Sequence, residues 1–112
     1  MSSPIYRLFR AAIIGRKQLI CHYQGLYREL CPHILGHTDG REVALIYQFA
    51  GESRRGLPRG GGWKCLRLSE ISEVRLREGP WHTGSSHRRR QPCVQAVDLD
   101  VNPSSPYTPR DE

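Results

Sequence analysis

The residues best able to do chemistry in this chain are cations and aromatic rings, and the chemistry they suit is anion binding. The chain has 17 lysines and arginines against 11 acidic residues, a formal net charge of +6. Such an excess attracts phosphates and other anions. Arg28 is expected on a strand beside aromatic residues, where a guanidinium can hold a phosphate through two parallel hydrogen bonds. Its alternative role is structural, as the partner of Glu70 or of a neighbour of Glu29.

Two aromatic residues and one lysine extend this hypothesis. Tyr23 ends an expected strand and can stack on a nucleobase, or it can lie in the core with its hydroxyl at the rim. Trp63 follows three glycines and is either a stacking platform or a buried anchor for the first helix. Lys64 offers a second positive charge to an anion. We therefore predict a ligand-binding site made of Tyr23, Arg28, Trp63 and Lys64.

The run HRRRQ places Arg88, Arg89 and Arg90 next to one another in a polar segment. Adjacent arginines of this kind contact the backbone of a nucleic acid without reading its sequence. The alternative is a basic loop that only faces solvent.

The sequence contains few residues in patterns that are typical of catalytic or metal-binding sites. The four cysteines form no CxxC pair, which disfavours a zinc knuckle and a thioredoxin-like redox site. We expect reduced thiols, no metal and no other cofactor. Cys31 and His33 share one face of an expected strand, but no third catalytic residue accompanies them. No Ser-His-Asp set or carboxylate pair is recognisable, so the sequence predicts a protein that is not an enzyme.

One helix and several short strands must position these residues. Ser2 or Ser3 can cap the helix, Pro4 suits its first turn and Gly15 can end it. Its apolar residues recur at helical spacing: Ile5, Leu8, Phe9, Ala12 and Ile13.

From Gln18 onward the pattern changes to alternation and tight turns, which predicts strands over 19–25, 26–35, 42–51, 63–71, 72–76 and 93–102. The Asp39-Gly40 pair is a hairpin signal, and Pro32 indicates an edge position or a bulge. Alternation places Trp63 on one face of its strand and Lys64 on the other.

A helix followed by about five strands in meander order predicts a mainly β protein with a small antiparallel barrel, one end of which the helix covers. A two-layer antiparallel sheet with one helix is the alternative. We expect the barrel within residues 1–79, and a basic linker, a possible extra strand and a frayed tail within 80–112. No apolar run is long enough to cross a membrane, and arginines interrupt the N-terminal apolar residues. We therefore expect a cytoplasmic protein.

Several short motifs occur in a recognisable order: the Ala12-Ile13 pair, LICHY ending in Tyr23, RELCPHIL beginning at Arg28, and KCLRLSEI beginning at Lys64. Their order resembles the WYL domain, a bacterial module with an Sm-like, SH3-type barrel, over roughly residues 5–76. Two places depart from the family pattern. Val43 and Ala44 stand where the Trp-Tyr of the family signature is expected, and Glu70 stands where a second arginine is expected.

The resemblance implies a ligand sensor, because WYL domains usually accompany DNA-binding segments in transcription regulators or CRISPR-associated proteins and bind nucleotides or nucleic-acid strands. It matches Tyr23 to the family tyrosine and Lys64 to a family arginine. We expect a stand-alone, non-enzymatic member that binds a nucleotide or a single-stranded nucleic acid. The alternative is a protein–protein assembly module, for example a homodimer, that pairs through the edge strands of the barrel and the strand within 93–102.

Overall fold

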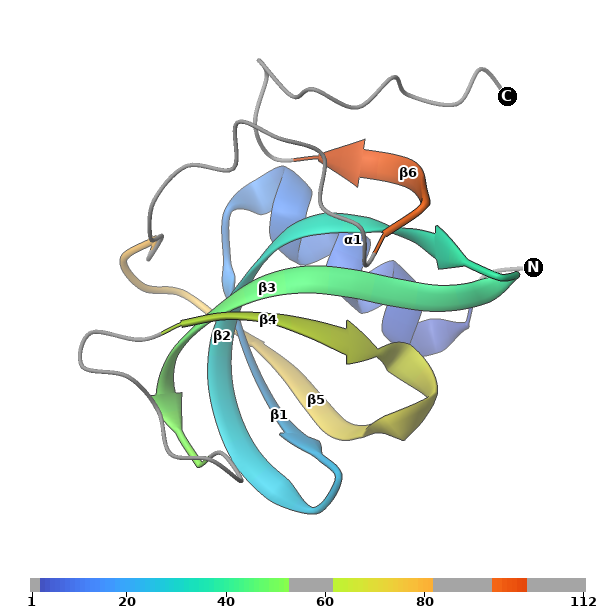
Figure 1. The fold of residues 1–112 in the computed structure, drawn as a ribbon. Helices are drawn as coiled ribbons and strands as arrows, with labels where there is room; N and C mark the ends of the chain where they lie inside the picture. Colours follow the sequence, from blue (N-terminus) through green and yellow to red (C-terminus); the bar gives the residue numbers. More distant parts are fainter. Residues whose placement is uncertain (1–2, 53–61, 82–93, 101–112) are drawn as a thin grey trace.

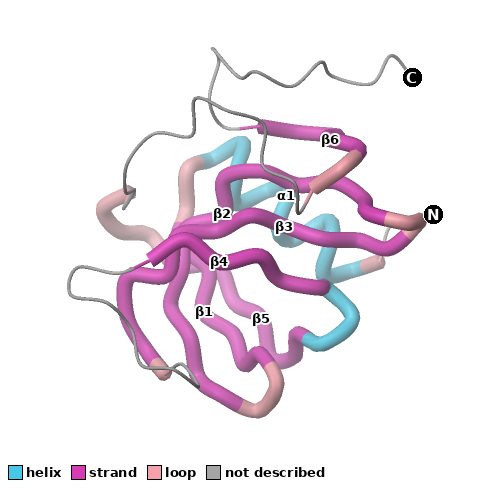
Figure 2. The backbone as a smooth tube through the Cα atoms, viewed as in Figure 1, coloured by secondary structure: helices cyan, strands magenta, loops and turns pink. Residues whose placement is uncertain are grey.

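The computed structural model describes residues 3–52, 62–81 and 94–100. It opens with one helix, α1 (Pro4–Gly15), and continues almost entirely as strands (Figures 1 and 2). These elements are β1 (Gln18–Tyr23), β2 (Leu26–Thr38), β3 (Arg41–Gly51), β4 (Gly62–Arg67), the 3₁₀ turn η1 (Leu68–Glu70), β5 (Ile71–Arg77) and β6 (Ala96–Asp100).

The strands form one antiparallel sheet in the order β4-β3-β2-β1-β5, and β6 pairs with β2 outside this path. The long strands β2 and β3 bend strongly, so the sheet curls around an interior while α1 lies against it (Figure 1). Among the described strands β4 and β5 are not paired with each other, so the sheet is barrel-like but not closed. The expected mainly β fold with an N-terminal helix is confirmed.

Helix α1 begins as its sequence predicts, and Gly15 is its last residue, although the left-handed residue that follows is Arg16 and not a glycine. The Ser3 side chain accepts a hydrogen bond from the Tyr6 amide at 3.1 Å, which satisfies one of the free amides of the first turn. Arg16 ends the helix in the left-handed region, with φ of 51°. The buried face of the helix consists of Tyr6, Phe9, Ala12 and Ile13.

Tight turns and one bulge set the register of the sheet. Asp39 and Gly40 both have positive φ, 53° and 77°, as a two-residue hairpin turn of the type I′ class requires. The pairing of β2 with β3 shifts between Pro32 and Ile34, so the bulge that Pro32 indicated is present. A proline cannot donate to the ladder, and a bulge removes that requirement.

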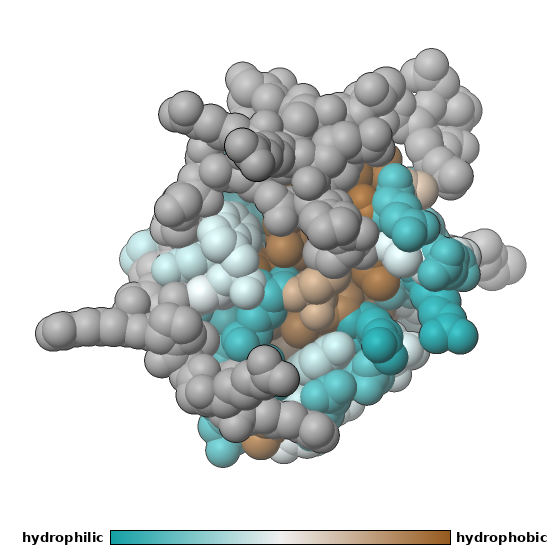
Figure 3. Space-filling view, viewed as in Figure 1, coloured by the Kyte–Doolittle hydropathy of each residue, from teal (hydrophilic) through white to brown (hydrophobic). Residues whose placement is uncertain are grey.

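Apolar side chains gather in two clusters on the two sides of the curved sheet. The interior cluster joins the buried face of α1 to residues of β1 to β5, including Leu19, Leu30 and Ile46. A second cluster contains Ile34, Val43, Leu45, Val94 and Val97. Figure 3 shows apolar side chains at the centre of one face of the molecule, with polar side chains around them.

The thiols differ from the expectation in one respect. Cys21 and Cys31 are free and buried, whereas Cys65 is exposed on β4 and is disulfide-bonded. The prediction that all cysteines are reduced is therefore wrong at Cys65. The absence of a CxxC pair says nothing against a disulfide between residues that are distant in the sequence.

Within the part of the chain that the structure describes, no helix combines the length and the apolar character needed to cross a membrane.

Candidate anion-binding site

The most unusual charged residue of the structure is Arg28, because it is buried. It lies near the start of β2, between Cys21 of β1 and Gly51 of β3, and only 4% of its surface is exposed. Arginine is almost never fully buried unless it is paired.

The guanidinium of Arg28 makes one cation–π contact and one hydrogen bond, and its Nε–H donor is buried without an acceptor. Its guanidinium carbon lies 5.0 Å from the centre of the Tyr23 ring, a favourable cation–π distance. One terminal nitrogen donates to Oε1 of Gln48 at 3.2 Å. The Nε–H group is buried and has no hydrogen-bond acceptor. A buried donor without an acceptor is costly, and in a native protein it calls for an explanation such as an absent ligand or ion.

No described carboxylate neutralises Arg28, because the acids of the neighbouring segments are engaged elsewhere. Glu29 forms an ion pair with Arg77, and Glu52 accepts a hydrogen bond from the amide of Tyr27. The structural alternative, in which Arg28 pairs with Glu70 or with an acid near Glu29, is therefore not observed among the described residues.

Glu70 instead contacts the hydroxyl of Tyr23 and the side chain of Gln24. Its carboxylate accepts from the Tyr23 hydroxyl at 3.4 Å and from the Gln24 side chain at 3.0 Å, and it lies 3.7 Å from the Arg67 guanidinium. The Tyr23 hydroxyl in turn accepts from the Arg67 amide at 3.3 Å. Tyr23 is thus a core residue with its hydroxyl at the rim, one of its two expected roles, and its ring still lies beside Arg28.

Gln48 holds the Arg28 guanidinium in place and is itself fully buried. Its side-chain nitrogen donates to the carbonyls of Ala50 at 3.1 Å and Glu52 at 2.9 Å. Its oxygen is thereby turned toward Arg28. Because all of these bonds are made, the amide has one favoured orientation and fixes the cation.

The other two expected ligand residues, Lys64 and Trp63, lie on opposite faces of strand β4. Lys64 pairs with Ile46, so it lies on the interior face of the sheet, the face to which Leu66 belongs. Trp63 pairs with Tyr47 and lies on the opposite face. The structure therefore brings Tyr23 and Arg28 into contact, places Lys64 on the interior face, and excludes Trp63 from this group.

Trp63 belongs to an aromatic cluster of its own. Its ring lies 4.7 Å from His33 and 5.2 Å from Tyr47, edge to face in both cases. The ring of Trp81 lies 5.0 Å from the ring of His33. Trp63 also packs against the second apolar cluster. The expectation that it anchors the helix is wrong, because the described helix contributes its apolar face to the interior cluster instead.

Two surface pockets are lined by Arg41, and neither is lined by Arg28. One, of about 500 Å³, includes Thr38 and Arg67; the other, of about 690 Å³, includes Glu42 and Leu68. Because Arg28 is 4% exposed, a ligand reaches its guanidinium only when the side chains over it move.

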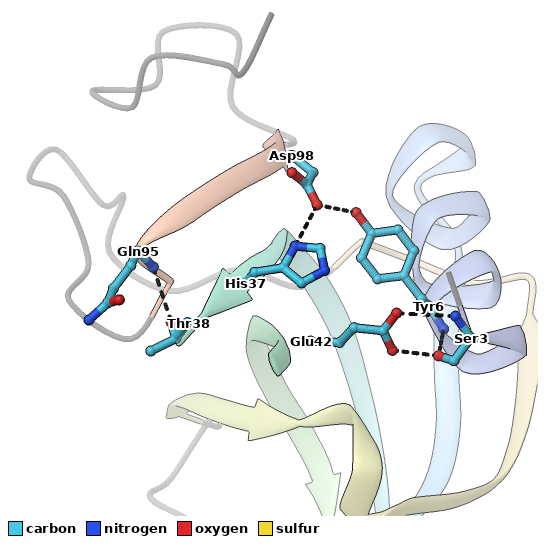
Figure 4. Close-up of polar contacts among 7 residues, drawn as sticks. All are labelled: Ser3, Tyr6, His37, Thr38, Glu42, Gln95 and Asp98. Atoms are coloured by element: carbon cyan, nitrogen blue, oxygen red, sulfur yellow. Dashed lines mark hydrogen bonds and ion pairs between the residues drawn. The ribbon is translucent and has the colours of Figure 1, made fainter. Parts of the chain in front are cut away.

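A second polar cluster joins three elements around one carboxylate, that of Asp98 on β6 (Figure 4). The Tyr6 hydroxyl of α1 donates to Oδ2 of Asp98, and Nδ1 of His37 on β2 lies 3.0 Å from the same oxygen. The rings of Tyr6 and His37 are stacked, with centroids 5.7 Å apart. Burial first, and then the hydrogen bond to Asp98, raise the pKa of Tyr6, so its hydroxyl stays protonated and acts as a donor.

Glu42 supports the same end of the helix. Its carboxylate accepts from the Ser3 amide at 3.1 Å and from the Ser3 hydroxyl (Figure 4). A carboxylate at the first turn of a helix interacts favourably with the helix dipole. Together Glu42 and Asp98 fasten α1 to β3 and β6, respectively.

Cys21 lies beside Arg28 and is affected by both its surroundings and that cation. Burial raises the pKa of the Cys21 thiol to about 11, and the charge of Arg28 opposes this effect. A thiol with a raised pKa is a poor nucleophile at neutral pH, so Cys21 is a packing residue. Across the described ranges, no group of three or more His, Cys, Asp and Glu side chains is arranged to hold a metal ion.

Sequence reasoning missed Gln48 and Asp98. Gln48 had a signal, since it is a polar residue within an almost continuously apolar strand, where a buried amide needs a partner. Asp98 had none, because its partners Tyr6 and His37 are far from it in the sequence. Arg88, Arg89 and Arg90 lie outside the described residues.

Comparisons with known proteins add no identity: no family model, no curated protein and no solved structure matches this chain.

Proposed function

We propose that this chain is a small, non-enzymatic ligand-sensing module that binds an anionic ligand, a nucleotide or a single-stranded nucleic acid, through Arg28. The observation that carries the proposal is the buried guanidinium with an unused Nε–H donor and no described carboxylate partner. A phosphate supplies both the missing charge and the missing acceptor. Tyr23 and Gln48 fix the cation, and Lys64 lies on the same interior face of the sheet.

The resemblance to WYL domains gives this proposal its ligand class. The Sm-like, SH3-type barrel that the resemblance implies is compatible with the observed strand order and the N-terminal helix. A regulatory role in transcription rests on the resemblance alone. We also propose a cytoplasmic location. The free thiols of Cys21 and Cys31 agree with this location. The disulfide of Cys65 argues against it, because disulfides are rare in the cytoplasm.

The test is binding of fluorescently labelled short single-stranded RNA and DNA, followed by fluorescence polarisation at low and near-physiological salt. Arg28→Met is compared with Arg75→Met, which removes the same charge from an exposed position on β5. We expect salt-sensitive binding that falls at least about tenfold with Arg28→Met and changes less than about twofold with Arg75→Met. Binding that survives in Arg28→Met would refute the site. Loss of that residual binding on replacing Arg88, Arg89 and Arg90 would assign it to the HRRRQ run.

Assembly through strand edges is the second candidate function. The observation that favours it is that β4 and β5 each have one sheet neighbour among the described strands, which leaves two edges available for pairing with another chain. Association through backbone pairing and apolar contact changes little with salt, whereas anion binding weakens steeply. Dimerisation that persists at high salt, without polyanion binding, would favour assembly.

A further inference from the structure

A cleft of about 690 Å³ opens where the first turn of α1, the start of β3 and the η1 turn meet. The strand pairing explains why the cleft forms. Strand β4 pairs with β3 only as far as Arg67, opposite Val43, and the chain then turns away through η1. The first two residues of β3, Arg41 and Glu42, therefore extend past the end of β4. The volume falls within the range of about 300 to 1,000 Å³ that is usual for small-molecule sites.

Aliphatic side chains from three elements line the cleft: Ile5 of α1, Leu68 of η1 and Ile71 of β5. Leu68 and Ile71 are buried members of the interior cluster, and Ile5 packs against that cluster. The cleft therefore reaches the margin of the core, where water finds few hydrogen-bond partners and a hydrocarbon chain gains by leaving water. No aromatic ring is among the described residues that line the cleft, so none of them offers a nucleobase a stacking surface.

Arg41 is the only lysine or arginine among the described lining residues. It is exposed, and its side chain forms no hydrogen bond or ion pair within the described ranges. A guanidinium holds a carboxylate through two parallel hydrogen bonds. Beside an apolar surface the attraction between these charges is screened less than in bulk water. The cleft thus joins an aliphatic surface to one available positive charge.

The acid that lines the cleft, Glu42, already has partners of its own. One of its oxygens accepts from the Ser3 amide at 3.1 Å and the other accepts from the Ser3 hydroxyl (Figure 4). Ser3 caps the N-terminus of α1, and the helix dipole offsets part of the Glu42 charge. Glu42 therefore stabilises the end of the helix and leaves the charge of Arg41 unpaired.

We propose that this cleft binds an aliphatic monocarboxylate, with its chain against Ile5, Leu68 and Ile71 and its carboxylate on Arg41. The single available cation matches one negative charge, whereas a phosphate monoester carries about −1.5 to −2 at pH 7. The exposed hydroxyl of Ser69 is a further donor at the same cleft. Arg28 does not line the cleft, so the inference is independent of the nucleotide or nucleic-acid site proposed above.

Titration of the nitrogen-15-labelled full-length chain with octanoate, octanol and acetate, followed by the NMR shifts of its backbone amides, tests both halves of the site. Octanoate is kept below the concentration at which it forms micelles. We expect octanoate to bind at least about tenfold more tightly than octanol, which has the same chain length without the charge. It should also bind at least about tenfold more tightly than acetate, which has the charge without the chain. The saturating shifts should include Ile5, Ser69 and Ile71.

Arg41→Gln removes the charge from an exposed position, so the fold should tolerate it. We expect this variant to bind octanoate no more tightly than octanol, and to bind octanol within about twofold of the wild-type affinity. The matched control is Arg75→Gln, which removes the same charge from an exposed position on β5 that does not line the cleft. Arg75→Gln and Arg28→Met should both bind octanoate as the wild-type chain does.

The proposal is overturned if octanoate gives no saturable shift at the cleft, or if acetate binds as tightly as octanoate. It is also overturned if Arg41→Gln keeps the wild-type preference for octanoate over octanol. Loss of octanoate binding in Arg28→Met, with binding retained in Arg41→Gln, would place the carboxylate at Arg28 and overturn the proposal as well.

Discussion

Replacing Arg28 by methionine should separate binding from stability. If Arg28 binds the ligand, Arg28→Met abolishes binding but leaves the free energy of unfolding nearly unchanged. If Arg28 stabilises the fold, the same substitution destabilises the protein. The structure distinguishes these outcomes because no described carboxylate would be left without its partner when Arg28 is removed.

The magnitude follows from three opposing contributions. The cation–π contact with Tyr23 at 5.0 Å contributes about 1 to 2 kcal/mol when desolvated. The hydrogen bond from Arg28 to Gln48 contributes about 1.5 to 3 kcal/mol, as is typical of a charged donor. Burial of the guanidinium costs several kcal/mol, which methionine does not incur. The sum is near zero, so we expect Arg28→Met to change the free energy of unfolding by less than about 1 kcal/mol.

Urea denaturation followed by tryptophan fluorescence and circular dichroism measures this change. Arg77→Met is the contrasting variant, because Arg77 pairs with Glu29 and donates to Gln18 at 2.9 Å. It should destabilise the protein by about 1 to 2 kcal/mol, since two partners lose a hydrogen bond. Destabilisation of about 3 kcal/mol or more by Arg28→Met, with ligand binding retained, would show that Arg28 stabilises the fold and does not bind the ligand.

Three further predictions concern the surroundings of the site. The Cys21 thiol should not react with a thiol reagent at pH 8 until the protein unfolds, because burial raises its pKa to about 11. The stability that the protonated Cys21 thiol contributes is complete below the unfolded pKa of about 8.5 and is lost as the pH rises through about 11. Fast labelling of Cys21 in the native protein would contradict this. Tyr23→Phe should cost about 1 kcal/mol in urea denaturation by removing the hydroxyl that bonds Glu70 and the Arg67 amide, and an unchanged midpoint would count against that pairing. Gly51→Ala should lower the free energy of unfolding by about 1 to 3 kcal/mol, because Gly51 has φ of 99° and a Cβ atom would lie 2.6 Å from the carbonyl oxygen of Tyr27; wild-type stability would show that this backbone relaxes.

The sequence predicted the local elements well because local physics decides them. Helical spacing and a capping serine located α1, and the Asp39-Gly40 pair located the turn between β2 and β3. Pro32 marked a bulge, since a residue without an amide hydrogen interrupts the ladder wherever it lies in a sheet. Alternation along β4 placed Trp63 and Lys64 on opposite faces.

Contacts between segments that are distant along the chain could not be predicted from the sequence. Arg28 was singled out, but its burial and its unused donor follow from how β1, β2 and β3 enclose it. Trp63 was predicted to bind the ligand or, alternatively, to anchor the helix, and nothing local indicated that its ring would pack against the second cluster. Asp98 carried no sequence signal, because its partners Tyr6 and His37 lie on α1 and β2, far from it along the chain.

If an anion binds the buried Nε–H donor of Arg28, nitrogen-15 NMR of arginine side chains observes the binding at that group itself. The Arg28 resonance is assigned by its absence from the Arg28→Met spectrum, and a short single-stranded oligonucleotide or a mononucleotide is then titrated in. We expect the Arg28 Nε–H signal to shift and to saturate at the midpoint found by fluorescence polarisation, while the Arg75 signal stays in place. Binding that leaves the Arg28 signal unmoved would contradict this expectation.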